Sequence, residues 1–93
     1  MNDMKKAVIT VIGIDKKGII ARVSAAMLEH DANILDISQT VLKGYFTMIM
    51  ITDIQTITVP FTEFIDRMNA LGKANGLEIH AMHEDIFNTM HKI

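Results

Sequence analysis

The chain has 93 residues, of which 49% are hydrophobic and 22% are charged, with a formal net charge of −2 and no cysteine. This length fits one domain covering residues 1–93 and is too short for a catalytic domain joined to a regulatory one. Nine basic residues against eleven acidic ones argue against a surface built for nucleic acid or an anionic membrane. The apolar stretch from Ala7 to Ile14 is too short for a membrane span or a signal sequence, so we expect a cytoplasmic protein.

The first half of the chain predicts a strand, a helix and a hairpin. β-branched residues crowd the stretch from Lys6 to Ile14, which is typical of a strand buried on both faces. From Gly18 to His30, apolar residues recur every three or four positions and predict an amphipathic helix. Alternating residues from Asn33 to Leu42 and from Tyr45 to Thr52, joined by a two-residue turn, predict a pair of antiparallel strands.

The second half predicts a helix, a strand and a short helical tail, after a stretch from 53 to 59 that no pattern assigns. Pro60 suits the first turn of a helix whose apolar residues run at helical spacing as far as Leu71, and Gly76 supplies its stop. Alternation from Leu77 to Met82 predicts a fourth strand, and the segment from Asp85 to Lys92 predicts a final helical piece.

This order of elements, βαββαβ with a tail, favours an α+β fold of the ferredoxin-like type. Its four antiparallel strands are expected in the order 4-1-3-2, with two helices on one face. The first and third strands are apolar on both faces, so the centre of the other face needs a cover. Phe87, Met90 and Ile93 of the tail are available to supply that cover.

The turn between the first strand and the first helix is the strongest candidate for a binding site. Ile19-Ile20 occupy the places where a phosphate loop needs a lysine and a hydroxyl residue, which excludes nucleotide binding by that route. The unpaired N–H groups of a helix that starts at Gly18 suit a carboxylate, and Asp15 suits an ammonium group. Together they match the two ends of an amino acid. The alternative is that Asp15 only caps the helix and Gly18 only closes the turn.

Two stretches of the chain resemble the ACT domain, a small ligand-binding module of enzymes and regulators of amino-acid metabolism. They are Val11-Ile12-Gly13-Ile14-Asp15-Lys16-Lys17-Gly18-Ile19-Ile20-Ala21-Arg22-Val23 and Asn33-Ile34-Leu35-Asp36. The ending from His83 to Ile93 is similar to the tail of stand-alone bacterial and archaeal ACT proteins related to regulators of the glycine cleavage system. The chain differs at Lys17, where ACT domains commonly have proline.

The resemblance implies that such domains pair and often hold an amino acid between this turn of one domain and the second strand of its neighbour. It assigns ligand contacts to Asp15, Gly18 and Ile19, with Asn33 and Ile34 nearby. The carboxamide of Asn33 both donates and accepts hydrogen bonds, which suits the polar end of a ligand. The alternative for Asn33 is a turn residue between helix and strand.

The histidines and serines show no pattern of a catalytic or metal site. His80 and His83 fall on opposite faces of the predicted strand, so they cannot coordinate the same metal ion. His83, Glu84 and His91 would form a ligand set only if the tail folded back, and the alternative makes these residues the charged ends of a short helix. Neither serine of the chain lies in a nucleophile motif.

We therefore expect a regulatory binding module that is not an enzyme and has no cofactor or metal. It is expected to form a homodimer or a higher homo-oligomer, because the predicted edge strand from Asn33 to Leu42 carries no proline or lysine that would block pairing. Its expected ligand is an amino acid, and it would act in trans on an unidentified protein of amino-acid metabolism or on its gene regulation. The alternative is a ligand-free interaction module of the same fold.

Overall fold

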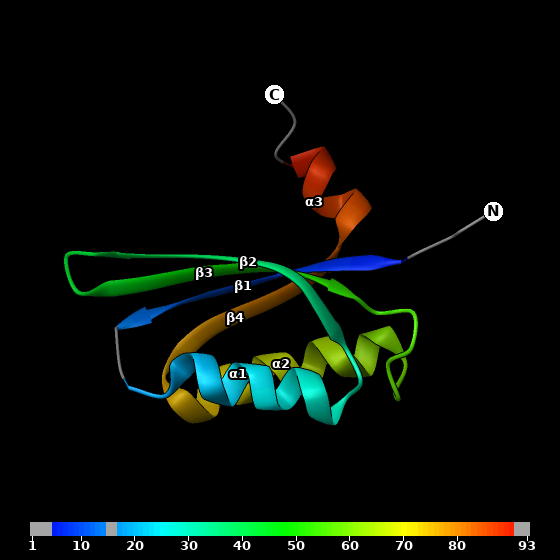
Figure 1. Cartoon of the computed structure of the whole chain (residues 1–93), viewed down its shortest axis with the longest axis horizontal. Helices are drawn as coiled ribbons and strands as arrows, with labels where there is room; N and C mark the ends of the chain where they lie inside the picture. Colours follow the sequence, from blue (N-terminus) through cyan, green and yellow to red (C-terminus); the bar gives the residue numbers. More distant parts are fainter. Residues whose placement is uncertain (1–4, 15–16, 91–93) are drawn as a thin grey trace.

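The computed structural model describes residues 5–14 and 17–90, and within them two helices lie against one face of a four-stranded sheet (Figure 1). The strands are β1 (Lys6–Ile14), β2 (Asn33–Leu42), β3 (Tyr45–Asp53) and β4 (Leu77–His83). The helices are α1 (Ile19–Glu29), α2 (Phe61–Asn75) and the short α3 (Glu84–Met90). All neighbouring strands are antiparallel and their order is β2-β3-β1-β4, which confirms the predicted fold and strand order.

The core lies between this sheet and the helices α1 and α2. Strand residues that pair across β1 and β3, such as Ile9 with Met50 and Val11 with Met48, place their side chains on the same face of the sheet. Phe46, Met48 and Met50 at strand spacing and Phe64 and Met68 at helix spacing all belong to the core. The fully buried large side chains of this core are Ile9, Val11, Val23, Met27, Met48, Met50, Phe64 and Met68.

Three local features differ from the sequence prediction. Pro60 is not in the first turn of α2 but precedes it, with an extended ψ of 149°, and the helix begins at Phe61. A β-bulge interrupts the pairing of β2 with β3 between Ile34 and Asp36, which strict alternation does not predict. Of the unassigned stretch from 53 to 59, Asp53 ends β3 and the rest forms a loop, in which the backbone N–H of Thr58 donates to the carbonyl oxygen of His30 at 3.1 Å.

The sheet face away from the helices is covered only at one end. Val8 lies on this face and is 2% exposed, and α3 packs against β1 and β4 there. Ile12 lies on the same face of the same strand and is 45% exposed, and Ile14 and Tyr45 are also exposed. The predicted cover by the tail is therefore partial. Ile93, which was expected to contribute to it, lies outside the described residues.

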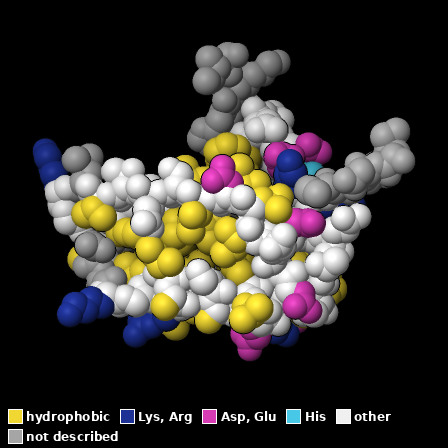
Figure 2. Space-filling model, in the orientation of Figure 1, with side chains coloured by type: hydrophobic (Ala, Val, Ile, Leu, Met, Phe, Trp, Pro, Cys, Tyr) yellow, Lys and Arg dark blue, Asp and Glu magenta, His cyan; other side chains and the backbone are white. Residues whose placement is uncertain are grey.

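Strand β2 forms one edge of the sheet, and hydrophobic side chains gather between this edge and α1 (Figure 2). Ile37 and Val41 pair with Met50 and Phe46, which are buried on the helix side of the sheet. They face the same side but are 41% and 54% exposed, because the helix layer does not extend over β2. Both an edge strand and an apolar strip beside it are thus open to a partner.

Candidate functional site

The predicted site residues that the structure describes fall into two groups, which lie at the two ends of α1. Gly18 precedes the helix and has a left-handed backbone with φ of 86°, which glycine adopts without strain. The first hydrogen bond of the helix runs from the backbone N–H of Arg22 to the carbonyl oxygen of Gly18. In the part of the chain that the structure describes, no side chain caps this end and its first turn has no acidic residue. Such leading N–H groups suit an anion.

Ile19 can meet a ligand at this end only through its backbone. Its side chain is 5% exposed and belongs to the core beneath the sheet. Asp15, which was predicted to bind the ammonium group, lies outside the described residues. Of the three residues predicted at this turn, the structure therefore describes two, and both offer backbone groups rather than side chains.

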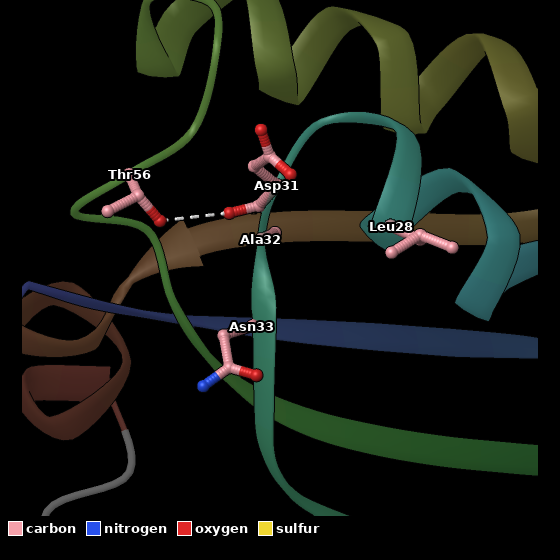
Figure 3. Close-up of a pocket in the computed structure, with 5 residues that line it drawn as sticks. All are labelled: Leu28, Asp31, Ala32, Asn33 and Thr56. Carbon is pink, nitrogen blue, oxygen red and sulfur yellow. Dashed lines mark hydrogen bonds between the residues drawn. The ribbon is translucent and has the colours of Figure 1, made fainter.

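The second group lies where α1 meets β2 and forms a pocket of about 290 Å³ (Figure 3). Leu28 comes from the last turn of α1, and Thr56 comes from the loop between β3 and α2. The turn and the start of β2 contribute Asp31, Ala32 and Asn33. A volume of this size is at the lower end for small-molecule sites and suits a compact ligand.

Hydrogen bonds fix the shape of this pocket. The Thr56 hydroxyl donates to the backbone carbonyl of Asp31 at 3.1 Å, so the loop is tied to the turn (Figure 3). The backbone N–H of Ala32 donates to the carbonyl oxygen of Met27 at 2.9 Å and closes the end of α1. Asp31 adopts a left-handed backbone with φ of 56°, which aspartate tolerates better than most residues. The carboxylate of Asp31 and the carboxamide of Asn33 are exposed beside this turn.

Sequence reasoning found only one residue of this pocket. Asn33, which was predicted to lie near the ligand, lines it, whereas Ile34 is half-buried and packs against the core. Asp31 marked only the end of a helix in the sequence, and Thr56 belongs to the stretch that no pattern assigned. The positive φ that Asp31 needs at a helix end was the one signal available for it.

The two ends of α1 are too far apart to hold one small ligand within a single chain. The helix has eleven residues and rises about 1.5 Å per residue, which separates its ends by roughly 16 Å. An amino acid spans much less than that. The turn at Gly18 and the pocket at Asn33 can therefore share a ligand only if they belong to two different chains.

The polar groups of the described residues do not assemble into a metal site. His83 accepts a hydrogen bond at Nδ1 from the backbone N–H of Asp85 and lies 3.6 Å from its carboxylate. His91, which a metal set would have needed, lies outside the described residues. No group of three or more potential ligands among residues 5–14 and 17–90 is arranged to hold a metal. None of the described helices is long and apolar enough to cross a membrane.

The sequence pattern of the ACT domain matches residues 5–81, which span six of the seven elements above. The chain belongs to the ACT domain family. A UPF0237 protein from Clostridium perfringens is 51% identical over 87 residues, which cover 94% of this chain and 98% of that protein. That relative is therefore itself a single ACT domain. Membership in the family implies a regulatory module that binds small molecules.

Solved structures support this ACT domain assignment. An ACT domain protein from Streptococcus pneumoniae superposes with a TM-score of 0.80 at 40% identity, and the match covers 91% of this chain and 96% of that one. A protein described as a glycine cleavage system transcriptional repressor superposes with a TM-score of 0.74 at 23% identity. That match covers 88% of this chain and 47% of the repressor, and it shows a shared fold.

Proposed function

We propose that this ACT domain is a cytoplasmic homodimeric sensor that is not an enzyme and binds a free amino acid between its two subunits. The helix end at Gly18 of one subunit would hold the carboxylate, and the pocket at Asn33 of the other would hold the ammonium end. The ligand-bound dimer would then act in trans on a protein of amino-acid metabolism or its gene regulation. The observation that carries this proposal is the placement of two incomplete half-sites at opposite ends of α1.

The chemistry of the two half-sites is complementary. Among the described residues, the N-terminus of α1 offers N–H donors and the positive end of the helix dipole, which suit a carboxylate. The pocket is instead rich in hydrogen-bond acceptors. Asp31 carries a carboxylate, and the Thr56 hydroxyl already donates its hydrogen to a backbone carbonyl, so its oxygen can only accept from a ligand. Asn33 adds both a donor and an acceptor. An ammonium group fits this wall, while Leu28 and Ala32 suit an apolar side chain.

The edge of the sheet supports the dimer that the shared site needs. On β2, the carboxylate of Asp36 accepts a hydrogen bond from the backbone N–H of Ile37 at 2.8 Å. The exposed Ile37 and Val41 add an apolar strip along this edge. A two-fold partner would pair the edge, cover the strip and stop further growth.

The experiment that tests the proposal is a thermal-shift panel of the twenty amino acids and related metabolites. A ligand present at about 100 times its Kd adds about 2.7 kcal/mol to the stability of the native state, so a true ligand raises the Tm clearly. Asn33→Ala should abolish that shift. Asp66→Ala, an exposed change on α2 away from this strand, is the control and should retain it.

The dimer requires its own measurement. Sedimentation equilibrium should give twice the mass of 10.4 kDa at micromolar concentration. A monomer that persists at high micromolar concentration would contradict both the dimer and the shared site. A dimer whose Tm is raised by no amino acid of the panel would instead favour a ligand-free interaction module.

A further inference from the structure

His30 is a buried residue that joins the end of α1 to α2 and to the loop before it. It is 5% exposed and follows the last residue of α1, where its backbone N–H donates to the carbonyl oxygen of Ala26. Its ring packs edge-on against the ring of Phe64 on α2, with centroids 5.9 Å apart. The imidazole is thus enclosed by two helices rather than placed at the surface.

The partners of the two ring nitrogens determine the charge of this ring. Nδ1 lies 2.8 Å from the carbonyl oxygen of Ala26, which can only accept, so Nδ1 carries a proton. Nε2 lies 3.2 Å from Nη1 of Arg67, and a guanidinium can only donate, so Nε2 is unprotonated. His30 is therefore a neutral imidazole with its proton on Nδ1, and each nitrogen has the one partner that suits it.

The backbone of His30 connects this ring to the wall of the pocket. The carbonyl oxygen of His30 accepts from the backbone N–H of Thr58 at 3.1 Å, and the next carbonyl, that of Asp31, accepts from the Thr56 hydroxyl. The same loop is therefore held at two successive carbonyls of the turn. Because Asp31 and Thr56 both line the pocket, the position of His30 sets the spacing of its two walls.

The charged groups around the ring come from α2 and from the segment of His30 itself. Arg67 faces Nε2 from α2, and Glu63, one helical turn away, pairs with Arg67 rather than with the histidine. On its own segment, His30 is flanked by Glu29 and Asp31, whose side chains are exposed. The loop before α2 meets His30 through the backbone of Thr58. A proton on Nε2 would replace an accepted hydrogen bond by two donors and two positive charges facing each other.

We propose that His30 is a positioning residue for the pocket at Asp31 to Asn33, and that protonation of its ring loosens this pocket. The neutral ring holds the end of α1 against Arg67, and the turn in turn holds the loop at Thr56 and Thr58. The proposal rests on the proposed function only in treating the pocket as a ligand half-site. Its test uses no ligand, so it can fail or succeed whatever the amino-acid panel shows.

The test is NMR of the full chain between about pH 8 and about pH 5, the range in which histidines usually titrate. Long-range proton–nitrogen correlations should show the Nδ1–H tautomer of His30 at the upper end. The protection factor of the Thr58 amide, which donates to His30, should fall by about tenfold as the ring titrates. The amide of Met27, buried within α1, should keep its protection and serves as the internal control.

Three variants separate positioning from mere packing. His30→Gln supplies a donor for Ala26 and an acceptor for Arg67 without a titrating ring, so Thr58 should stay protected over the whole range. Arg67→Met removes the opposing charge, so the dependence of Thr58 protection on pH should shrink while the core stays folded. His30→Leu offers neither a donor to Ala26 nor an acceptor to Arg67, so the Thr58 amide should lose protection at every pH.

Four results would overturn the proposal. The first is a ring with its proton on Nε2 at the upper end of the range. The second is a ring that titrates while the Thr58 amide keeps its full protection, and the third is a ring that stays neutral throughout. A His30→Gln protein that shows the same dependence on pH as the original chain would also overturn it, because the dependence would then arise elsewhere.

Discussion

Gly72 on α2 lies so close to β4 that a Cβ atom built on it would stand 2.7 Å from the carbonyl oxygen of Leu77. The same atom would lie 3.1 Å from the Ile79 side chain, and Gly72 is itself buried. The obstacle is a backbone oxygen, which cannot rotate away as a side chain can. The missing side chain therefore sets how near α2 approaches the edge strand β4, and with it the packing of the core around Phe64 and Met68.

Gly72→Ala should lower the free energy of unfolding by roughly 1–3 kcal/mol, because the added methyl group forces the helix and the strand apart. This outcome is the reverse of the usual gain from replacing glycine by alanine inside a helix. Chemical denaturation measures it. Asp66→Ala, an exposed change on the same helix, is the control and should stay within about 0.5 kcal/mol. An unchanged Gly72→Ala protein would show that α2 can shift freely on the sheet.

A pair of variants distinguishes the two carboxylates that could bind a ligand ammonium group. Asp31→Asn keeps the shape and tolerates the left-handed backbone, so it should fold normally while weakening ligand binding by about 1.5–3 kcal/mol. Asp15→Ala should abolish the ligand shift if the prediction from the sequence is right, at a cost of about 1 kcal/mol in stability. Isothermal titration with an amino acid from the panel measures both. If one variant retains its ligand affinity, the residue it replaces does not bind the ammonium group.

A charge placed on the free edge should weaken the proposed dimer. Ser38 is exposed on β2, and Ser38→Lys sets like charges against each other where two copies of this strand would meet. Sedimentation velocity should show a larger monomer fraction without loss of the folded state. Ala70→Lys, on the exposed side of α2, adds the same charge away from the edge and should leave the dimer intact. Equal effects of both changes would point to net charge rather than to the edge.

Removal of the chain after His83 should uncover one end of the open sheet face. Val8 is 2% exposed beside α3, whereas Ile12 on the same face is 45% exposed, so the loss of α3 adds new apolar surface to an existing patch. Binding of a hydrophobic dye and aggregation should both rise. Ile86→Ser changes a residue of α3 that is already 55% exposed and should leave dye binding unchanged. A truncated chain that remains soluble and does not bind the dye would show that α3 does not shield the sheet face from solvent.

The secondary structure could be predicted because the apolar residues of each helix or strand repeat at the spacing typical of that element. The alternation from Asn33 to Leu42 and the turn at Lys43-Gly44 needed no information from elsewhere in the chain, and both turn residues have the positive φ that such a hairpin requires. The helix at Phe61 to Asn75 and its stop at Gly76 are equally local. The strand order followed because few topologies satisfy right-handed connections with this order of elements.

For the candidate site, the sequence predicted individual residues but not their arrangement. Gly18 and Asn33 could be proposed from residue types beside a helix start and a strand start, because helix ends and turns have local chemical signatures. The sequence alone also favoured an amino acid as the ligand. It could not show that the two residues lie at opposite ends of α1, where one chain cannot bring them to a single small ligand.

Only the tertiary structure assembled the pocket and the contacts that hold it. Thr56 reaches the carbonyl of Asp31 across 25 positions of the chain, and Arg67 reaches the ring of His30 across 37. Periodicity records which face of an element is buried, but it carries no information on which remote side chain will satisfy a given polar atom. That choice depends on how α1, α2 and the loop between β3 and α2 pack on one sheet, and it decides which residues surround the pocket and which nitrogen of His30 carries the proton.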